Sequence, residues 1–228
     1  MQLTTTDVVG ATHGLKFLVH GPAGVGKTRL CATTGELDRT IILSAEAGLL
    51  SLRDYSIATI AIASMQDMRD AAGYLLSDEG TKYTWVCVDS LSELAQICLS
   101  EEMKKHDDGR AAYGEMADTM FKLIRAFRDL PGRNVVFTSK QVRIESDGRL
   151  LYAPMLPGKQ LSQNISHQFD EVFAMRSQAS ADDSKVQRWL HTVHDGYYEA
   201  KDRSGALDAS EPPNLAHIAS KILTKATT

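Results

Sequence analysis

The sequence is short of the features that mark secreted, membrane-spanning and metal-binding proteins. Its three cysteines, Cys31, Cys87 and Cys98, lie in apolar surroundings without a CxxC spacing, so we expect buried, reduced thiols. The seven histidines show no metal-ligand spacing. There is no run of 18 apolar residues, no signal peptide and no lipidation motif. These absences predict a soluble, cytoplasmic protein without a membrane partner.

An excess of positive charge is also missing. The formal net charge is −4, from 25 Lys and Arg against 29 Asp and Glu. Any contact with nucleic acid must therefore come from a local basic patch. With 43% hydrophobic residues the chain can bury a substantial core. We predict one domain over residues 1–228, with an N-terminal segment at 1–14 and a C-terminal tail helix within 211–228.

Strand-like and helix-like segments alternate along the chain, which is typical of a mostly parallel sheet covered by helices. We expect strands over 15–20, 40–44, 84–89, 134–139, 169–175 and 186–193. We expect helices over 27–34, 65–76, 92–105, 113–130 and 215–225. Residues 141–166, which contain several glycines and prolines, are expected to be rich in loops. The pattern predicts an α/β fold with a C-terminal β extension.

The stretch GPAGVGKT at 21–28 follows an apolar strand and leads into a helix. It is a P-loop in the strand–loop–helix setting that this motif requires. Its glycines let backbone N–H groups converge on phosphate oxygens. Lys27 is expected to reach the β- and γ-phosphates of ATP, and Thr28 to bind Mg²⁺ through its hydroxyl. The expected nucleotide-binding residues are Gly21, Pro22, Ala23, Gly24, Val25, Gly26, Lys27, Thr28 and Arg29.

A second element of the nucleotide site is WVCVDS at 85–90, a hydrophobic strand that ends in an acid. Open α/β sheets present ligands at the carboxyl ends of their strands, so Asp89 can hold Mg²⁺ through water opposite Thr28. Alternatively, Asp89 or Ser90 caps the next helix, since Ser90 and Glu93 have the spacing of a capping box. Both interpretations can hold together.

Two further polar residues follow predicted strands. Glu46 comes soon after the apolar run 41–43, and Gln141 after the run 135–138, so both are expected beside the P-loop. This arrangement resembles the RecA-like recombinase and helicase family. The resemblance implies that Glu46 is the general base that polarises the attacking water and that Gln141 senses the γ-phosphate. The alternatives are an exposed loop acid and an ordinary polar residue.

The stretch EAKDRSG at 199–205 resembles the basic-x-basic element that RecA-like ATPases project across a subunit interface. The resemblance implies that Lys201 and Arg203 neutralise the charge of the transition state in the neighbouring subunit's site. This role requires a homo-oligomer, either a ring or a filament. The alternative is two solvated charges after a strand.

The region 141–166 lies where RecA-like recombinases have a DNA-binding loop. Arg143, Arg149 and Lys159 would supply cations for phosphates, and a β-hairpin with a surface loop is the alternative. Together with the P-loop, the stretches EAG, YGE, SKQ, LPGK and AKDR resemble the small phage-encoded RecA-like ATPases of the single-strand annealing recombinase group.

The resemblance implies a DNA-stimulated, ATP- and Mg²⁺-dependent ATPase. Its expected substrate is single-stranded DNA in phage recombination, annealing or replication, and a single-strand-binding protein is an expected partner. One alternative is a nucleotide-gated DNA-binding module whose hydrolysis is incidental. Another is a small-molecule phosphotransferase, which the size of the chain favours, although an Arg-rich lid segment is missing.

Overall fold

The computed structural model describes residues 14–225 except 47, 147 and 180–185. Ten strands of these residues form one sheet in the order β10-β8-β7-β1-β5-β4-β2-β3, with β6 paired to β5 and β9 to β7. The strands are β1 (Lys16–Gly21), β2 (Thr40–Ser44), β3 (Ala58–Ala61), β4 (Trp85–Asp89), β5 (Asn134–Ser146), β6 (Arg149–Pro154), β7 (Glu171–Ala179), β8 (Val186–His191), β9 (Lys201–Asp202) and β10 (Ser210–Glu211). From β7 to β3 in this order, all neighbouring strands pair in parallel. Strand β8 pairs antiparallel with β7, and β10 pairs antiparallel with β8.

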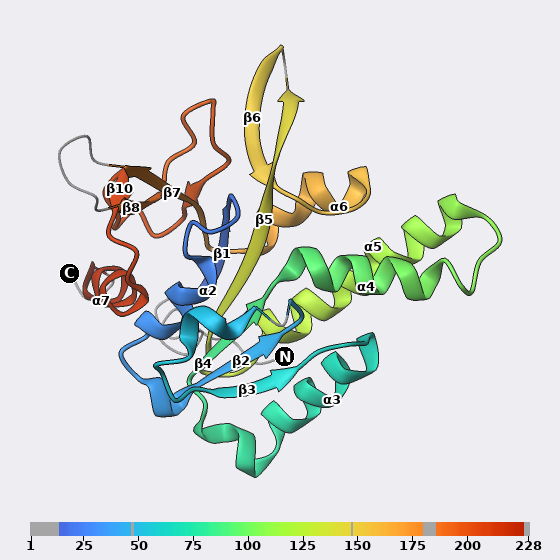
Figure 1. Cartoon of the computed structure of the whole chain (residues 1–228), viewed down its shortest axis with the longest axis horizontal. Helices are drawn as coiled ribbons and strands as arrows, with labels where there is room; N and C mark the ends of the chain where they lie inside the picture. The colour runs from blue at the N-terminus through green and yellow to red at the C-terminus, as the bar shows by residue number, and fades with distance from the viewer. Residues whose placement is uncertain (1–13, 47, 147, 180–185, 226–228) are drawn as a thin grey trace, which may run out of the picture.

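Helices cover both faces of this sheet (Figure 1). The helices are α2 (Lys27–Leu30), α3 (Met65–Leu76), α4 (Leu91–Glu102), α5 (Gly109–Arg128), α6 (Lys159–Asn164) and α7 (Leu215–Lys225). Short 3₁₀ turns lie at Cys31–Thr33, Leu37–Arg39, Leu49–Leu52, Asp78–Lys82 and Ile165–Gln168. The prediction of a mostly parallel α/β sheet with a β extension is confirmed.

The central strands are buried on both faces, which explains their continuous apolar sequences. Side chains alternate along each strand, so Val86 and Val88 join the core under α3, α4 and α5, while Trp85 and Cys87 join the core under α2 and α7. Each large apolar side chain buried in this way contributes about 1.5–3 kcal/mol to stability. The two cores hold the carboxyl ends of β1, β2, β4 and β5 at one edge.

The expectation of loops over 141–166 is wrong. Strand β5 continues beyond the sheet and pairs antiparallel with β6, from Gln141 opposite Pro154 to Ser146 opposite Arg149. The sequence explains this, because alternating aliphatic and polar residues flank an Asp-Gly pair, a strong hairpin signal, and Gly148 has φ of +73°. We call residues 141–154 the arm. It projects from the sheet at the top of Figure 1.

Smaller differences concern short elements. The helix expected over 27–34 is α helix only as far as Leu30 and continues as a 3₁₀ turn. Strands β3, β9 and β10 have two to four residues, too few to give a periodic pattern. Among the described residues no helix is both long and apolar enough to cross a membrane.

Candidate functional site

The P-loop connects the end of β1 to α2. Gly24 and Gly26 have φ of +73° and +112°, which other residues rarely adopt. A Cβ on Gly21 would lie 2.7 Å from the backbone oxygen of Met175, so only glycine fits there. The ammonium of Lys27 donates to the carbonyls of Gly21 at 2.9 Å and Pro22 at 3.0 Å. Burial lowers the pKa of Lys27, against the opposite effect of nearby carboxylates.

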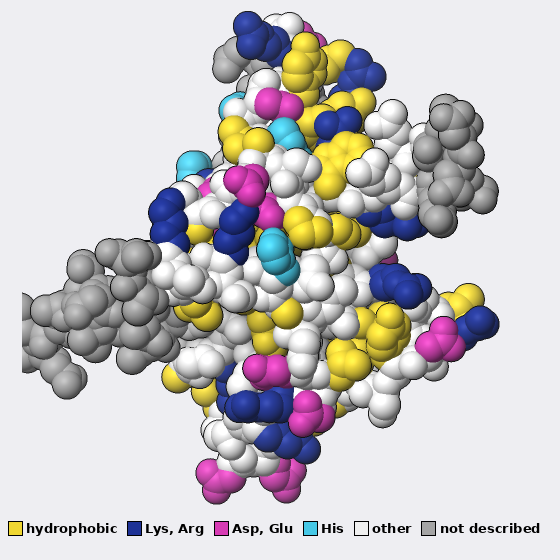
Figure 2. All heavy atoms as spheres, turned by 90° about the vertical axis from the view of Figure 1, so that its left-hand side faces the viewer, with side chains coloured by type: hydrophobic (Ala, Val, Ile, Leu, Met, Phe, Trp, Pro, Cys, Tyr) yellow, Lys and Arg dark blue, Asp and Glu magenta, His cyan; other side chains and the backbone are white. Residues whose placement is uncertain are grey.

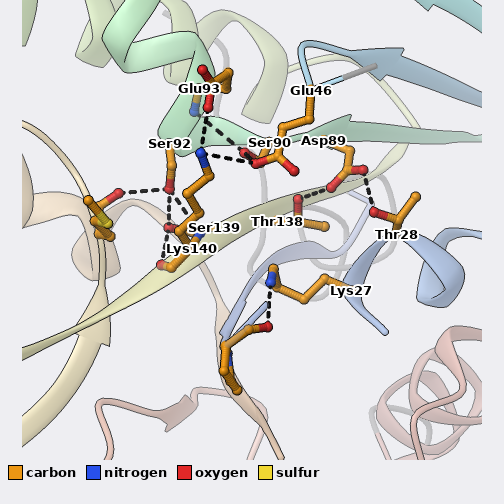
Figure 3. A network of polar contacts seen from close by, with 12 residues as sticks. Lys27, Thr28, Glu46, Asp89, Ser90, Ser92, Glu93, Thr138, Ser139 and Lys140 are labelled. Atoms are coloured by element: carbon orange, nitrogen blue, oxygen red, sulfur yellow. Dashed lines mark hydrogen bonds and ion pairs between the residues drawn. The ribbon is translucent and has the colours of Figure 1, made fainter. Parts of the chain in front are cut away.

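Asp89 is the best-buried acid of the site, with 1% of its surface exposed. Its Oδ2 accepts a hydrogen bond from the Thr28 hydroxyl at 2.7 Å, and its Oδ1 accepts one from the Thr138 hydroxyl. Figure 3 shows these three side chains meeting from α2, β4 and β5. A carboxylate beside a threonine hydroxyl is the oxygen pair that suits Mg²⁺, with the remaining positions open to phosphate and water. The Thr28 and Asp89 side chains therefore fit the predicted ion.

Glu46 lies in the bend after β2, where it is exposed and takes part in a polar network. Its Oε1 accepts a hydrogen bond from the Ser90 hydroxyl at 2.6 Å. The ammonium of Lys140 lies 3.7 Å from the same oxygen and 2.6 Å from Oε2 of Glu93 (Figure 3). Ser90 is also the N-cap of α4, since its side chain accepts from the Glu93 backbone N–H, as the capping interpretation predicted.

A cavity of about 520 Å³ joins the P-loop to these residues. Lys27, Thr28, Glu46, Lys140 and Gln141 all line it. The side-chain oxygen of Gln141 is buried, and Gln141 interacts with the ring of His20 behind the cavity. The structure therefore brings together in one cavity the P-loop residues with Lys27 and Thr28, the predicted general base Glu46 and the predicted sensor Gln141. Asp89 does not line the cavity but bonds the Thr28 hydroxyl behind it.

Lys201 and Arg203 lie elsewhere. Lys201 in β9 pairs with Val172 of β7, and Val172 pairs with Leu18 of β1. Leu18 lies three residues before Gly21, which is about 10 Å along the strand. The Lys201 ammonium donates to the carbonyls of Ser166, at 2.8 Å, and Phe169, and burial lowers its pKa.

Arg203 directly follows β9, and its backbone N–H donates to the Asp170 carbonyl. It forms an ion pair with Asp170 at 2.7 Å. Both side chains therefore have partners within their own chain and stand apart from the P-loop of that chain. A role for them at a nucleotide would require a neighbouring subunit's site.

The predicted DNA-binding residues are exposed and separate from the P-loop. Arg143 and Arg149 lie on the arm, and Lys159 begins α6 below it. Figure 2 shows basic and acidic side chains interspersed over the face that it draws, with blue and yellow side chains together at its top.

Sequence reasoning missed Thr138, Lys140 and Arg188. The first two stand at alternate positions where a buried strand turns polar, a signal that both face the site. Arg188 comes from β8, and its Nε donates to the backbone oxygen of Val25 in the P-loop at 2.9 Å. No local pattern indicated this contact, which depends on how the β extension folds back.

Comparisons with known proteins agree with this geometry. A family model described as an AAA domain matches residues 13–204. Among solved structures, a KaiC-like protein from the hyperthermophilic archaeon Pyrococcus horikoshii OT3 aligns with a TM-score of 0.50 and 13% identity, covering 83% of each chain. No curated protein matches the chain. At this identity the structural likeness shows the fold alone, a RecA-like P-loop fold. The chain therefore belongs to the AAA domain family of P-loop ATPases.

Proposed function

We propose that this protein is an ATP- and Mg²⁺-dependent ATPase whose hydrolysis is coupled to single-stranded DNA bound at the arm. One observation carries the proposal: strand β5 supplies Thr138 to Asp89 and Lys140 to Glu46, and then becomes the arm. A continuous strand transmits displacement better than a loop, because its ladder of hydrogen bonds resists local bending. DNA at the arm would thereby act on the hydrolytic residues.

Each residue of the cavity has a distinct part in hydrolysis. The P-loop N–H groups bind phosphate oxygens, and Lys27 exchanges its bonds to Gly21 and Pro22 for bonds to phosphate. Thr28 and Asp89 would hold Mg²⁺, which would supply positive charge against the phosphates. Glu46 orients the attacking water and accepts its proton.

The coupling at the arm involves Gln141, the first residue of the arm. Gln141 lines the cavity, so its side-chain amide can donate to a γ-phosphate oxygen. This contact changes when nucleotide is hydrolysed. Gln141 would therefore report the state of the nucleotide to the arm.

Single-stranded DNA suits the composition of the arm and its surroundings. Arg143 and Arg149 are exposed for phosphate contacts, and Ile144 and Leu150 are 40% and 45% exposed. The ring of Tyr152 in the arm stacks on the ring of Tyr198, with centroids 5.1 Å apart. Cations together with apolar and aromatic surface are the usual means of binding a single strand. Annealing or recombination of phage DNA, with help from a single-strand-binding protein, is the process we propose.

The decisive experiment measures ATP hydrolysis with and without single-stranded DNA. We expect the rate to rise several-fold with single-stranded DNA and less with duplex DNA. An ATPase that ignores DNA would contradict the proposed substrate but not the ATPase assignment. Annealing that survives the loss of Lys27 would support the nucleotide-gated alternative, and transfer of phosphate to a nucleoside would support a phosphotransferase.

We predict that replacing Arg143, Arg149 and Lys159 by Ala together lowers the affinity for single-stranded DNA. Each phosphate contact releases counterions from the DNA when it forms, so each contact that is lost should reduce the steepness of log affinity against log salt by about 0.7. Titrations at several salt concentrations measure both effects, and basal ATPase should persist. The matched control replaces three exposed cations distant from the arm, Arg39, Arg69 and Lys105. An unchanged slope in the arm variant would mean that the arm is an ordinary surface hairpin.

A further inference from the structure

The cavity contains a second cation besides Lys27. The Lys140 backbone is held at both ends: its N–H donates to the Ser92 hydroxyl at 2.9 Å, and its carbonyl accepts from the Met155 N–H at 2.8 Å. Its side chain is 46% exposed and ends between two carboxylates, Glu93 and Glu46. Lys140 therefore has a fixed backbone and a head group that can exchange partners.

The ion pairs of Lys140 are unequal. The ammonium hydrogen-bonds Glu93 at 2.6 Å and lies 3.7 Å from Glu46, whose oxygen is already bonded to Ser90. The hydrogen bond to Glu93 and the charges of both acids raise the pKa of Lys140, so its charge is secure. Exposed ion pairs of this kind stabilise a fold only weakly. A more highly charged partner in the same cavity can therefore draw the ammonium away.

A triphosphate is such a partner. Lys140 and Glu46 line the cavity that the P-loop closes. A γ-phosphate carries more negative charge than one carboxylate, and charge-assisted bonds to it are strong. In the empty site the Ser90 hydroxyl and the Lys140 ammonium both contact Oε1 of Glu46, and together they fix the direction in which the carboxylate points. Loss of the Lys140 contact would let the carboxylate turn toward a water molecule.

Accordingly, and resting on the proposed ATPase function, we propose that Lys140 is a positioning residue for Glu46. It restrains the Glu46 carboxylate against Ser90 in the empty site and moves to the terminal phosphate when ATP binds, which frees Glu46 for water. Glu93 keeps the ammonium at the entrance to the cavity between these states. ADP, which has no γ-phosphate, leaves the restraint in place.

The first test compares Mg²⁺ complexes of a non-hydrolysable ATP analogue and of ADP by calorimetry on the full chain. Lys140→Met should weaken the analogue about tenfold and change ADP less than twofold, while Lys140→Arg retains the preference for triphosphate. The control is Lys105→Met, which removes a similar ion pair, 2.7 Å to Glu102, outside the cavity. Equal weakening of both nucleotides by Lys140→Met would overturn the proposal. Wild-type protein that binds neither nucleotide would instead refute the ATPase function itself.

The second test is a double-mutant cycle on affinity for the analogue. If Lys140 must leave Glu46 to reach phosphate, Glu46→Gln should tighten binding about threefold with Lys140 present and less with Met at position 140. If Lys140 instead stays beside Glu46 and never contacts phosphate, Glu46→Gln should tighten binding more with Met at position 140, because Glu46 repels phosphate most when no cation lies beside it. That result, in variants whose thermal unfolding matches wild type, would contradict the exchange of partners.

Discussion

Replacing Glu46 by Gln is expected to reduce kcat for ATP hydrolysis by about a hundredfold or more while nucleotide binding persists. Glutamine keeps the shape of the side chain and can still bond Ser90, but it cannot accept the proton of water. Steady-state hydrolysis and equilibrium binding of labelled ATP measure the two quantities separately.

Lys27→Ala provides the contrasting variant. It should lose hydrolysis and also bind ATP more weakly, because the phosphates lose a half-buried cation of the P-loop. Near-normal turnover in Glu46→Gln would show that another group activates the water. An equal loss of binding in both variants would mean that Glu46 has a structural role only.

Replacing Arg203 by Ala is expected to lower hydrolysis about a thousandfold, the scale of an arginine that stabilises transferred phosphate from a neighbouring subunit. Arg203 lies beside β7 away from the P-loop of its own chain and pairs with Asp170. Mixing inactive Arg203→Ala with inactive Lys27→Ala should therefore restore activity. In random assemblies, about a quarter of the interfaces would join an intact P-loop to an intact Arg203.

The mixing experiment needs two controls. Each variant must assemble and exchange subunits, which light scattering and labelled protein can show. Arg69→Ala, which removes an exposed arginine from α3, should hydrolyse ATP normally alone. If exchanging mixtures remain as inactive as either parent, Lys201 and Arg203 act only within their own chain, where they already bond Ser166, Phe169 and Asp170.

The sequence by itself determined the P-loop and the order of the main strands and helices. Local periodicity carried this information: β2, α3 and α7 have the predicted bounds, and the P-loop needs only eight consecutive residues. Asp89 could be predicted because an acid at the end of a buried strand is a local signal. Its bond to Thr28 follows from the parallel sheet.

Only the tertiary structure decided which distant residues meet. Ser90 and Glu46 are 44 residues apart, and Lys140 and Glu93 are 47 apart; they meet because β4 lies between β2 and β5. Strand order depends on how whole faces pack, which no short window of sequence contains. The same holds for Lys201, whose place on the sheet depends on β9 pairing with β7. The sequence thus indicates which residues can do the chemistry, while the packing of the sheet decides which side chains each of them contacts.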